Sequence, residues 1–465
     1  MYKKNSGLRA VFLIIIVVFA NGAISQENRI WTLEKCIEHA WENNLMLQQQ
    51  KLSVDLAGEN LTQSRANMLP SLNAGASHSY NIGRTVDPFT NDFITETVQA
   101  NSFNATSSVS LFNGFQLRNI IRQNRYDLEA GKLDLERSYN DIALTVASAY
   151  LQILFSIELL ENANNQLDIS RQQVVRTGQL VEAGTLPRGS LLTIQAQMAT
   201  EELQVVNAQN QLDLAILNLR QIMYMPEDEE LNIEIPVVDI LPDEEIRESP
   251  MQVYQTAIQI QPEIKSADVR VFSAERGLAA SKGARSPSLS LSGSVGTGYS
   301  DARREQIFVI DPETGFPIPE FGDVIPFADQ FRDNVNQSFG LFLNIPIFNN
   351  LQVRSNISRS QINLENARLQ SRIAREQLFQ TIQQAHADAS AALKRYIATE
   401  TNVVALEESF RYTEQRFNVG MVNTLEYNDA KNRLSAAQSE LLQAKYEYLF
   451  RTKILDFYLG NPLTF

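Results

Sequence analysis

Long stretches of the chain carry apolar side chains at the three- and four-residue spacing of one helix face. The two clearest stripes are Val205, Ala208, Leu212, Ala215 and Leu219, and Leu434, Ala437, Leu441, Ala444 and Tyr448. Alternating steps of three and four residues keep such side chains on one seam, as in a coiled coil. The stripes therefore predict long helices that pack lengthwise, although a plain filamentous coiled coil would show the same pattern.

Four shorter stretches alternate instead between apolar and small polar residues, which is typical of a β-strand with two different faces. They cover residues of about 71–81, 102–112, 288–299 and 336–347. Their length suits a tilted transmembrane strand, with one face toward lipid and the other toward water. His78 lies on the nominal apolar face, and we expect it near the edge of the membrane. The alternation favours a membrane β-barrel over a filament.

The chain contains one unit twice. SLFNGFQLRN (110–119) recurs as PIFNNLQVRS (346–355), and LVEAGTLPRG (180–189) recurs as RFNVGMVNTL (416–425), both at an offset of 236 residues. A helix of about 32–67 in the first copy corresponds to one of about 250–284 in the second, and each ends before a proline. The copies differ in length only within 301–334, which we expect to be a loop.

The duplication divides the chain into two repeats and a linker, and the same order of helix and strand patterns occurs in both repeats. These segments are the first repeat, 26–225, with a long helix over 114–183 and a helix over 187–225; an acidic linker, 226–250; and the second repeat, 251–465, with a long helix over 349–419, a helix over 423–459 and a C-terminal tail. In each repeat the two strands lie between the first helix and the long helix.

Four strands are too few to close a barrel that spans a bilayer. An open sheet edge in lipid leaves backbone N–H and C=O groups without partners, so the chain must oligomerise. Three copies would supply 12 strands, an even number within the range of outer-membrane barrels. The segments that join the strands, 81–101 and 300–334, are then expected outside the cell.

The N-terminus indicates export. Basic residues precede an apolar run over 10–20 that is too short to span a bilayer, and small residues precede Gln26. Residues 1–25 are therefore predicted to be a cleaved signal peptide. Beyond it we find no stretch of 18 apolar residues, so no transmembrane helix is expected in the mature protein.

Composition narrows the function. The formal net charge is −14, which argues against a nucleic-acid partner. A single cysteine, Cys36, and three histidines exclude a disulfide framework and a zinc site built mainly from Cys and His. Cys36 is expected to be a small buried apolar residue. No catalytic, cofactor or metal site is expected, because no nucleophile, histidine and acid form a recognisable set.

Several motifs together resemble the TolC family of outer-membrane efflux proteins. They are the opening WTLEKCIEHAWENN, the PSL after the first helix of each repeat, LFNGFQLR with IFNNLQVR, and RFNVGMVNTLEY. Their order and duplication extend the resemblance over essentially the whole mature chain. It implies an α plus transmembrane β fold with internal duplication: a homotrimeric 12-stranded outer-membrane β-barrel continued by a long periplasmic α-helical coiled-coil barrel.

The resemblance also implies a function. We expect a passive exit duct of a tripartite efflux or type I secretion system, with an outer-membrane location and the helical part in the periplasm. Its expected partners are a periplasmic adaptor, an inner-membrane transporter of the RND or ABC type, and outer-membrane lipid. The alternative is a trimeric coiled-coil envelope adhesin or structural protein. An adhesin should have one rod with strands at one end, whereas here each repeat has strands within it.

The candidate functional residues cluster at the two helix-to-helix turns. The geometry of the turn is enough to explain Gly184 and Gly420, because a helix often ends at a residue with positive φ, which is usually glycine. The resemblance adds that adaptors dock at such tips, so the docking candidates are Gly184, Thr185, Leu186, Gly420, Met421 and Val422.

Two acids follow the second turn. Glu426 could form an N-x-x-E capping box with Asn423, and acids favour a helix N-terminus. The resemblance implies in addition that Glu426 and Asp429 line the closed periplasmic entrance, where three copies of each would make acidic rings. The polar clamp of the family is not reproduced, because Phe417, Val422 and Ser190 stand at its positions. We expect Phe417 to supply an apolar constriction instead.

Overall fold

The computed structural model describes residues 30–86, 93–95, 97–226, 231–236, 248–313 and 315–463. The expected signal peptide and much of the expected linker lie outside the described residues. The chain divides into two compact units, and each unit draws on both sequence repeats. The first unit comprises Met1–Lys51, Leu135–Pro262 and Arg375–Phe465, and the second comprises Leu52–Asp134 and Glu263–Ala374.

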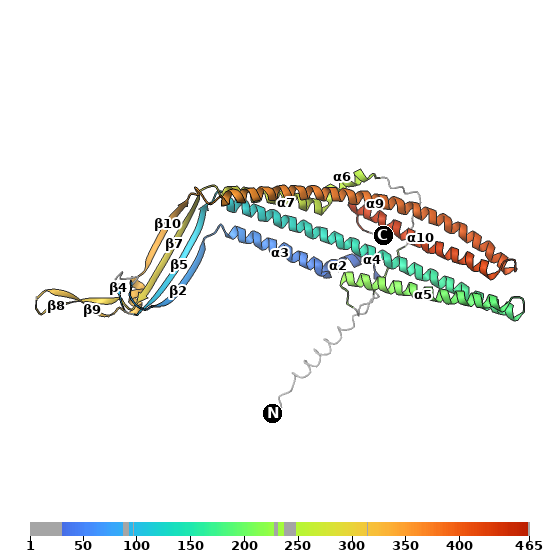
Figure 1. The fold of residues 1–465 in the computed structure, drawn as a ribbon, viewed down its shortest axis with the longest axis horizontal. Helices are drawn as coiled ribbons and strands as arrows, with labels where there is room; N and C mark the ends of the chain where they lie inside the picture. The colour runs from blue at the N-terminus through green and yellow to red at the C-terminus, as the bar shows by residue number, and fades with distance from the viewer. Residues whose placement is uncertain are drawn as a thin grey trace, which may run out of the picture. The chain divides into compact units, whose positions relative to one another are not determined.

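The two repeats fold into the same series of main elements. In the first repeat these are α2 (Leu33–Asn43), α3 (Leu45–Ala66), β2 (Ser71–Asn81), β5 (Val98–Phe112), α4 (Gln116–Glu182) and α5 (Arg188–Met223). In the second they are α6 (Pro250–Ile260), α7 (Pro262–Gly283), β7 (Ser288–Ser300), β10 (Asn336–Asn344), α9 (Gln352–Asn418) and α10 (Thr424–Leu459). The long helices α4 and α9 have 67 residues each, and the returning helices α5 and α10 have 36 each. Figure 1 shows each long helix turning back into its shorter one.

The first helix of each repeat is two helices rather than one. The chain leaves helical geometry at Asn44 (ψ 122°) and at Gln261 (ψ 124°). In the second repeat the cause is Pro262, because the residue before a proline avoids helical ψ. In the first repeat the Asn44 side chain accepts the N–H of Met46 at 2.9 Å and so starts the next helix. The expectation of continuous helices over 32–67 and 250–284 was wrong at these two points.

The four main strands form one antiparallel sheet in the order β10-β7-β5-β2, which Figure 1 shows side by side. Strand β5 begins at Val98, ahead of the expected 102, because Val98 pairs with Asn81 at the end of β2. Strand β10 ends at Asn344, ahead of the expected 347. Pro346, two residues later, has no N–H to continue the ladder. The outer edges of β2 and β10 have no strand partner among the described residues.

The two faces of this sheet differ as the alternation predicts. On one face, Leu341 stands opposite Leu291, which stands opposite Val109. On the other face, a row of small polar residues crosses all four strands: Ser338, Ser294, Thr106 and Asn73. The apolar face carries large exposed side chains such as Phe339 and Leu341. Such a face is disfavoured in water, because it leaves a continuous apolar surface uncovered.

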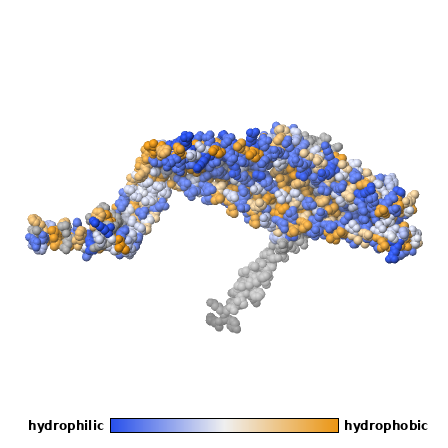
Figure 2. All heavy atoms as spheres, viewed as in Figure 1, coloured by the Kyte–Doolittle hydropathy of each residue, from blue (hydrophilic) through white to orange (hydrophobic). Residues whose placement is uncertain are grey.

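The segment over 300–334 contains regular structure, contrary to the prediction of a loop. It holds a hairpin of β8 (Arg304–Ile310) and β9 (Pro317–Val324), followed by a short helix, α8 (Phe327–Asp333). The prolines in β9 suggested a loop, but prolines are tolerated on edge strands. Figure 2 shows apolar side chains exposed on this hairpin, and they include Phe308 and Phe321. Along the chain, β2 and β5 are separated by a second small hairpin, formed by β3 (Thr85–Val86) and β4 (Phe93–Ile94).

The main core of the first unit lies between α2, α4, α5 and α10. Its most deeply buried side chains include Cys36, Val146, Leu219 and Met223, each with no exposed surface. Cys36 is thus the buried apolar residue that its context predicts. The hydroxyl of Tyr150 donates to the Glu234 carbonyl at 2.6 Å. It thereby fixes the end of β6 (Asn232–Ile233), which pairs in parallel with β1 (Ile30–Trp31).

Helix α4 contains a stretch that is long and apolar enough, by length and composition, to cross a membrane. Our expectation concerned an unbroken run of 18 apolar residues, and α4 does not contradict it, because polar residues interrupt every run of that length in the helix. Half of the stretch is buried within the protein. Ala147, Tyr150 and Leu154 of α4 belong to the core just described. Core packing therefore accounts for the apolar composition of the helix.

Candidate functional site

The two helix-to-helix turns are built alike. Gly184 has φ +74° and Gly420 has φ +77°, both in the left-handed region that favours glycine. At each turn two backbone N–H groups reach back into the preceding helix. Thr185 N–H donates to the Leu180 carbonyl at 2.9 Å, and Met421 N–H donates to the Arg416 carbonyl at 2.8 Å. This is a Schellman motif, which satisfies the last carbonyls of α4 and α9.

The docking candidates differ in accessibility. Thr185 is exposed, and its hydroxyl donates to the Leu180 carbonyl at 2.8 Å. Leu186 is half-buried, whereas Met421 is 72% exposed. Val422 is buried at 9% exposure, so its side chain packs into the protein and offers little surface to a partner. The two glycines offer backbone only.

Glu426 and Asp429 are both exposed, and each lies beside an arginine. The Asn423 side chain accepts the N–H of Glu426 at 2.9 Å, so Asn423 caps α10. The Glu426 carboxylate, however, contacts Arg416 at 3.3 Å rather than completing a capping box. Asp429 pairs with Arg433 at 2.9 Å, four residues on. Of the predicted capping box, the contact from Asn423 is confirmed. The contact from the Glu426 carboxylate is not formed, because Arg416 competes for it.

Phe417 lies against an aromatic side chain of the same tip. Its ring stacks on Tyr427, with 4.7 Å between the centroids and 28° between the planes. Tyr427 also contacts Phe410, at 5.5 Å between centroids. Burial raises the pKa of the Tyr427 hydroxyl to about 12. Tyr427 was not among the predicted site residues, yet it covers part of the ring expected to form a constriction.

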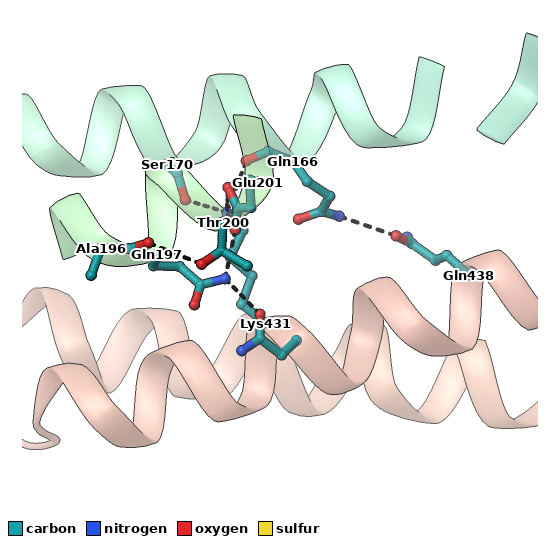
Figure 3. A network of polar contacts seen from close by, with 9 residues as sticks. Gln166, Ser170, Ala196, Gln197, Thr200, Glu201, Lys431 and Gln438 are labelled. Atoms are coloured by element: carbon teal, nitrogen blue, oxygen red, sulfur yellow. Dashed lines mark hydrogen bonds and ion pairs between the residues drawn. The ribbon is translucent and has the colours of Figure 1, made fainter. Parts of the chain in front are cut away.

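A buried polar cluster lies two turns into α10, and we call it the Lys431 network (Figure 3). It consists of Lys431, Glu201 on α5, and Gln166 and Ser170 on α4. The Lys431 ammonium donates to the Glu201 carboxylate at 2.9 and 3.1 Å. It also donates to the Gln166 carbonyl at 2.8 Å and to the Ser170 hydroxyl at 2.7 Å. An ammonium has three N–H donors, and this set of partners uses them all.

The network is deeply buried: the side chains of Lys431 and Glu201 are 2% and 4% exposed. Burial lowers the pKa of Lys431, while the bond to Glu201 opposes that shift. Figure 3 shows the side chains converging from three helices, α4, α5 and α10. The cluster therefore joins the helical hairpin of the first repeat to that of the second.

The residues of the Lys431 network were not among the predicted site residues, although the sequence contains a signal for them. Glu201 lies four residues before Val205 and Lys431 lies three residues before Leu434, so each extends an apolar stripe. A charge in line with a buried stripe needs a partner of opposite sign. The stripes supplied one acid and one base, 230 residues apart.

The described part of the chain was also searched for clusters of metal-binding side chains. No group of three or more His, Cys, Asp and Glu side chains there is arranged to hold a metal ion.

A known protein family matches both repeats of the chain. The family model described as outer membrane efflux protein matches residues 36–223 and 253–461, one stretch in each repeat. Outer membrane protein TolC of Escherichia coli is 24% identical over 465 residues, which is 97% of this chain and 86% of that protein. The outer membrane efflux protein BepC of Brucella suis is 24% identical over 448 residues, 94% of this chain and 86% of that protein.

Solved structures show the same fold at lower identity. The outer membrane protein VceC of Vibrio cholerae matches with a TM-score of 0.74 and 16% identity, over 92% of this chain and 96% of that chain. The MtrE outer membrane channel of Neisseria gonorrhoeae matches with a TM-score of 0.71 and 20% identity, over 93% and 89%. These comparisons confirm the resemblance stated from the motifs. The chain belongs to the outer membrane efflux protein family and is located in the outer membrane, with its helical part in the periplasm.

Proposed function

We propose that the protein is a passive exit duct, formed by three copies of the chain, in a tripartite efflux or type I secretion system. The observation that carries the proposal is the four-stranded sheet. It has one apolar face, one small polar face and two outer edges, β2 and β10, without strand partners among the described residues. In lipid such edges must pair with further strands.

Three copies satisfy this requirement. Each β10 edge can pair with the β2 edge of the next copy, which closes a barrel of 12 strands around a lumen lined by small polar side chains. The apolar face then contacts lipid. The long helices α4 and α9, each about 100 Å at 1.5 Å per residue, continue the duct into the periplasm.

Gel electrophoresis and bilayer recording together test this function. The purified protein, left unheated in SDS, is expected to migrate as a trimer that becomes a monomer on boiling. In a planar lipid bilayer it is expected to produce discrete conductance steps. A heat-labile trimer without conductance would instead support the envelope adhesin or structural protein. A monomer without conductance would contradict both functions.

We further propose that the helix tips dock a periplasmic adaptor, through which an inner-membrane transporter of the RND or ABC type supplies the energy. Three apolar side chains at the second tip support this: Val419, Met421 and Leu425 are each more than two-thirds exposed. Apolar side chains grouped on a surface are typical of a protein contact.

Photo-crosslinking in cells tests the docking. A photoreactive amino acid at Met421 is expected to capture an adaptor-type periplasmic protein, identified by mass spectrometry. Met46 on α3 is the matched control, since it is 71% exposed against 72% for Met421 but lies away from the tip in sequence. Equal capture of the adaptor from both positions, or none from Met421, would contradict docking at this tip.

A further inference from the structure

The Lys431 network differs from the two ion pairs nearest the second tip in what it joins. The pair of Arg416 with Glu426 links α9 to α10, and the pair of Asp429 with Arg433 lies within α10. Both therefore stay within the helical hairpin of the second repeat, and both are about half exposed or more. Lys431, in contrast, connects that hairpin to α4 and α5 of the first repeat.

Burial makes this connection hard to loosen. A charged side chain that loses its partner inside a protein keeps its desolvation penalty, so separating the pair is far more costly than for an exposed ion pair. Lys445 and Glu158 provide a comparison, because they also join α10 to α4, at 3.1 Å. Their side chains are 27% and 25% exposed, so water can replace a lost partner.

We propose that Lys431 and Glu201 are positioning residues that set the width of the periplasmic entrance, by fixing α10 against α4 and α5 just behind the tips. The proposal rests on the proposed function as a duct. It also accounts for the missing polar clamp at the turns, where Phe417, Val422 and Ser190 carry no charge. A fully buried ion pair connects the hairpins instead, two turns deeper into α10.

Removing the ammonium has a predictable consequence. In Lys431→Met the Glu201 carboxylate stays inside the protein without its cation, and such a charge is relieved by admitting water. A polar groove of about 370 Å³ provides the route, because Glu201 is part of its wall together with Gln197, Thr200 and Asn432. Hydration from this groove separates α5 from α10, and the entrance widens.

Single-channel recording in planar bilayers measures that width. We expect the Lys431→Met protein to show a mean conductance about twofold above wild type, with greater current noise, because the narrowest part of a duct limits its current. Lys445→Met is the matched control, and it is expected to conduct as wild type does. Unchanged conductance in Lys431→Met, or an equal rise in both variants, would overturn the proposal.

A second variant separates this role from a loss of folding. In Lys431→Met, Glu201→Gln the unpaired charge is gone, so the neutral amide is tolerated and the conductance is expected to return most of the way to wild type. Heat-labile trimers on SDS gels verify that each variant assembles. If Lys431→Met does not assemble, Glu201→Gln alone serves as the test, with an expected rise and with wild-type conductance as the contrary result.

The outcomes distinguish this proposal from the function on which it depends. A wild-type protein that gives no conductance overturns the duct itself. A wild-type protein that conducts, together with a Lys431→Met variant of the same conductance, overturns only the positioning role.

Discussion

At the scale of single residues, burial decides which of the reactive side chains remain inert. Cys36 lies in the core with no exposed surface, and burial raises the pKa of its thiol to about 12, with a smaller contribution from the nearby charge of Glu34. The thiolate is the nucleophile, and raising the pKa reduces its population.

We therefore expect Cys36 to resist maleimide labelling in the folded protein at pH 8. A rise from 9.0 to about 12 lowers the thiolate fraction about a thousandfold at this pH. Met421→Cys in a Cys36→Ala background is the exposed control and should label within minutes. Mass spectrometry with and without denaturant measures the difference. Rapid labelling of Cys36 without denaturant would contradict the core described here.

Glu426 and Asp429 remain candidates for the lining of the entrance. Because each lies beside an arginine, removing the acids and removing an arginine should shift the ion selectivity in opposite directions. Three copies of each acid would favour cations, while Arg416 and Arg433 reduce that charge. The double change Glu426→Gln, Asp429→Asn is expected to move the reversal potential in a KCl gradient toward zero. Arg433→Gln, which frees Asp429, is expected to move it the other way.

The control for these charges is Glu440→Gln, an exposed acid further along α10. It should leave the reversal potential unchanged. If all three variants retain the wild-type potential, the acids do not line the conducting path, and their contribution is limited to the start of α10.

At the scale of elements, backbone geometry determines where each long helix ends. Two glycines of the first tip illustrate this, since neither would bring a Cβ within 4 Å of another group. Gly178 lies inside α4, whereas Gly184 has φ +74° just beyond it. Only the second requires a conformation that other residues adopt at a cost of about 1–2 kcal/mol.

The same substitution at these two sites should therefore have opposite effects. Gly178→Ala is expected to stabilise the end of α4 by about 0.5–1 kcal/mol, because alanine is the better helix former. Gly184→Ala is expected to destabilise the turn by about 1 kcal/mol. Hydrogen exchange of the amides over 180–185 should slow in the first variant and speed up in the second. Slower exchange in both would show that the left-handed turn is not maintained.

At the scale of the whole molecule, assembly in the membrane depends on the two faces of the sheet. Leu341 and Ser338 lie on the same strand, three residues apart and on opposite faces. Leu341→Arg would place a charge on the face proposed to contact lipid, which costs about 2–4 kcal/mol near the middle of a bilayer. Ser338→Arg would place the same charge in the aqueous lumen.

We accordingly expect Leu341→Arg to deplete the protein from the outer-membrane fraction and Ser338→Arg to leave its amount near wild type. Quantitative immunoblots of washed outer membranes measure both. Depletion by Ser338→Arg alone would mean that the assignment of the faces is inverted. Equal amounts of both variants would mean that the apolar face is covered by protein rather than lipid.

The sequence by itself determined the repeated series of helices and strands, the two faces of the sheet and the positions of the turns at Gly184 and Gly420. Each of these depends on residues close together in the chain, through a period of 2 or 3.6 or through the backbone freedom of a single glycine. The break at Asn44 was not predicted because no proline or glycine marks it, although asparagine favours a helix N-cap over a helix interior.

Only the tertiary structure decided which residues meet across the hairpins. Neither apolar stripe specifies which stripe of another helix it will face, so the pairing of Glu201 with Lys431 could not be read from either one. Within the second hairpin, the local pattern also left open the stacking of Phe417 on Tyr427 and the burial of Val422. Local periodicity tells a helix which side to bury, and only packing in three dimensions determines what that side contacts.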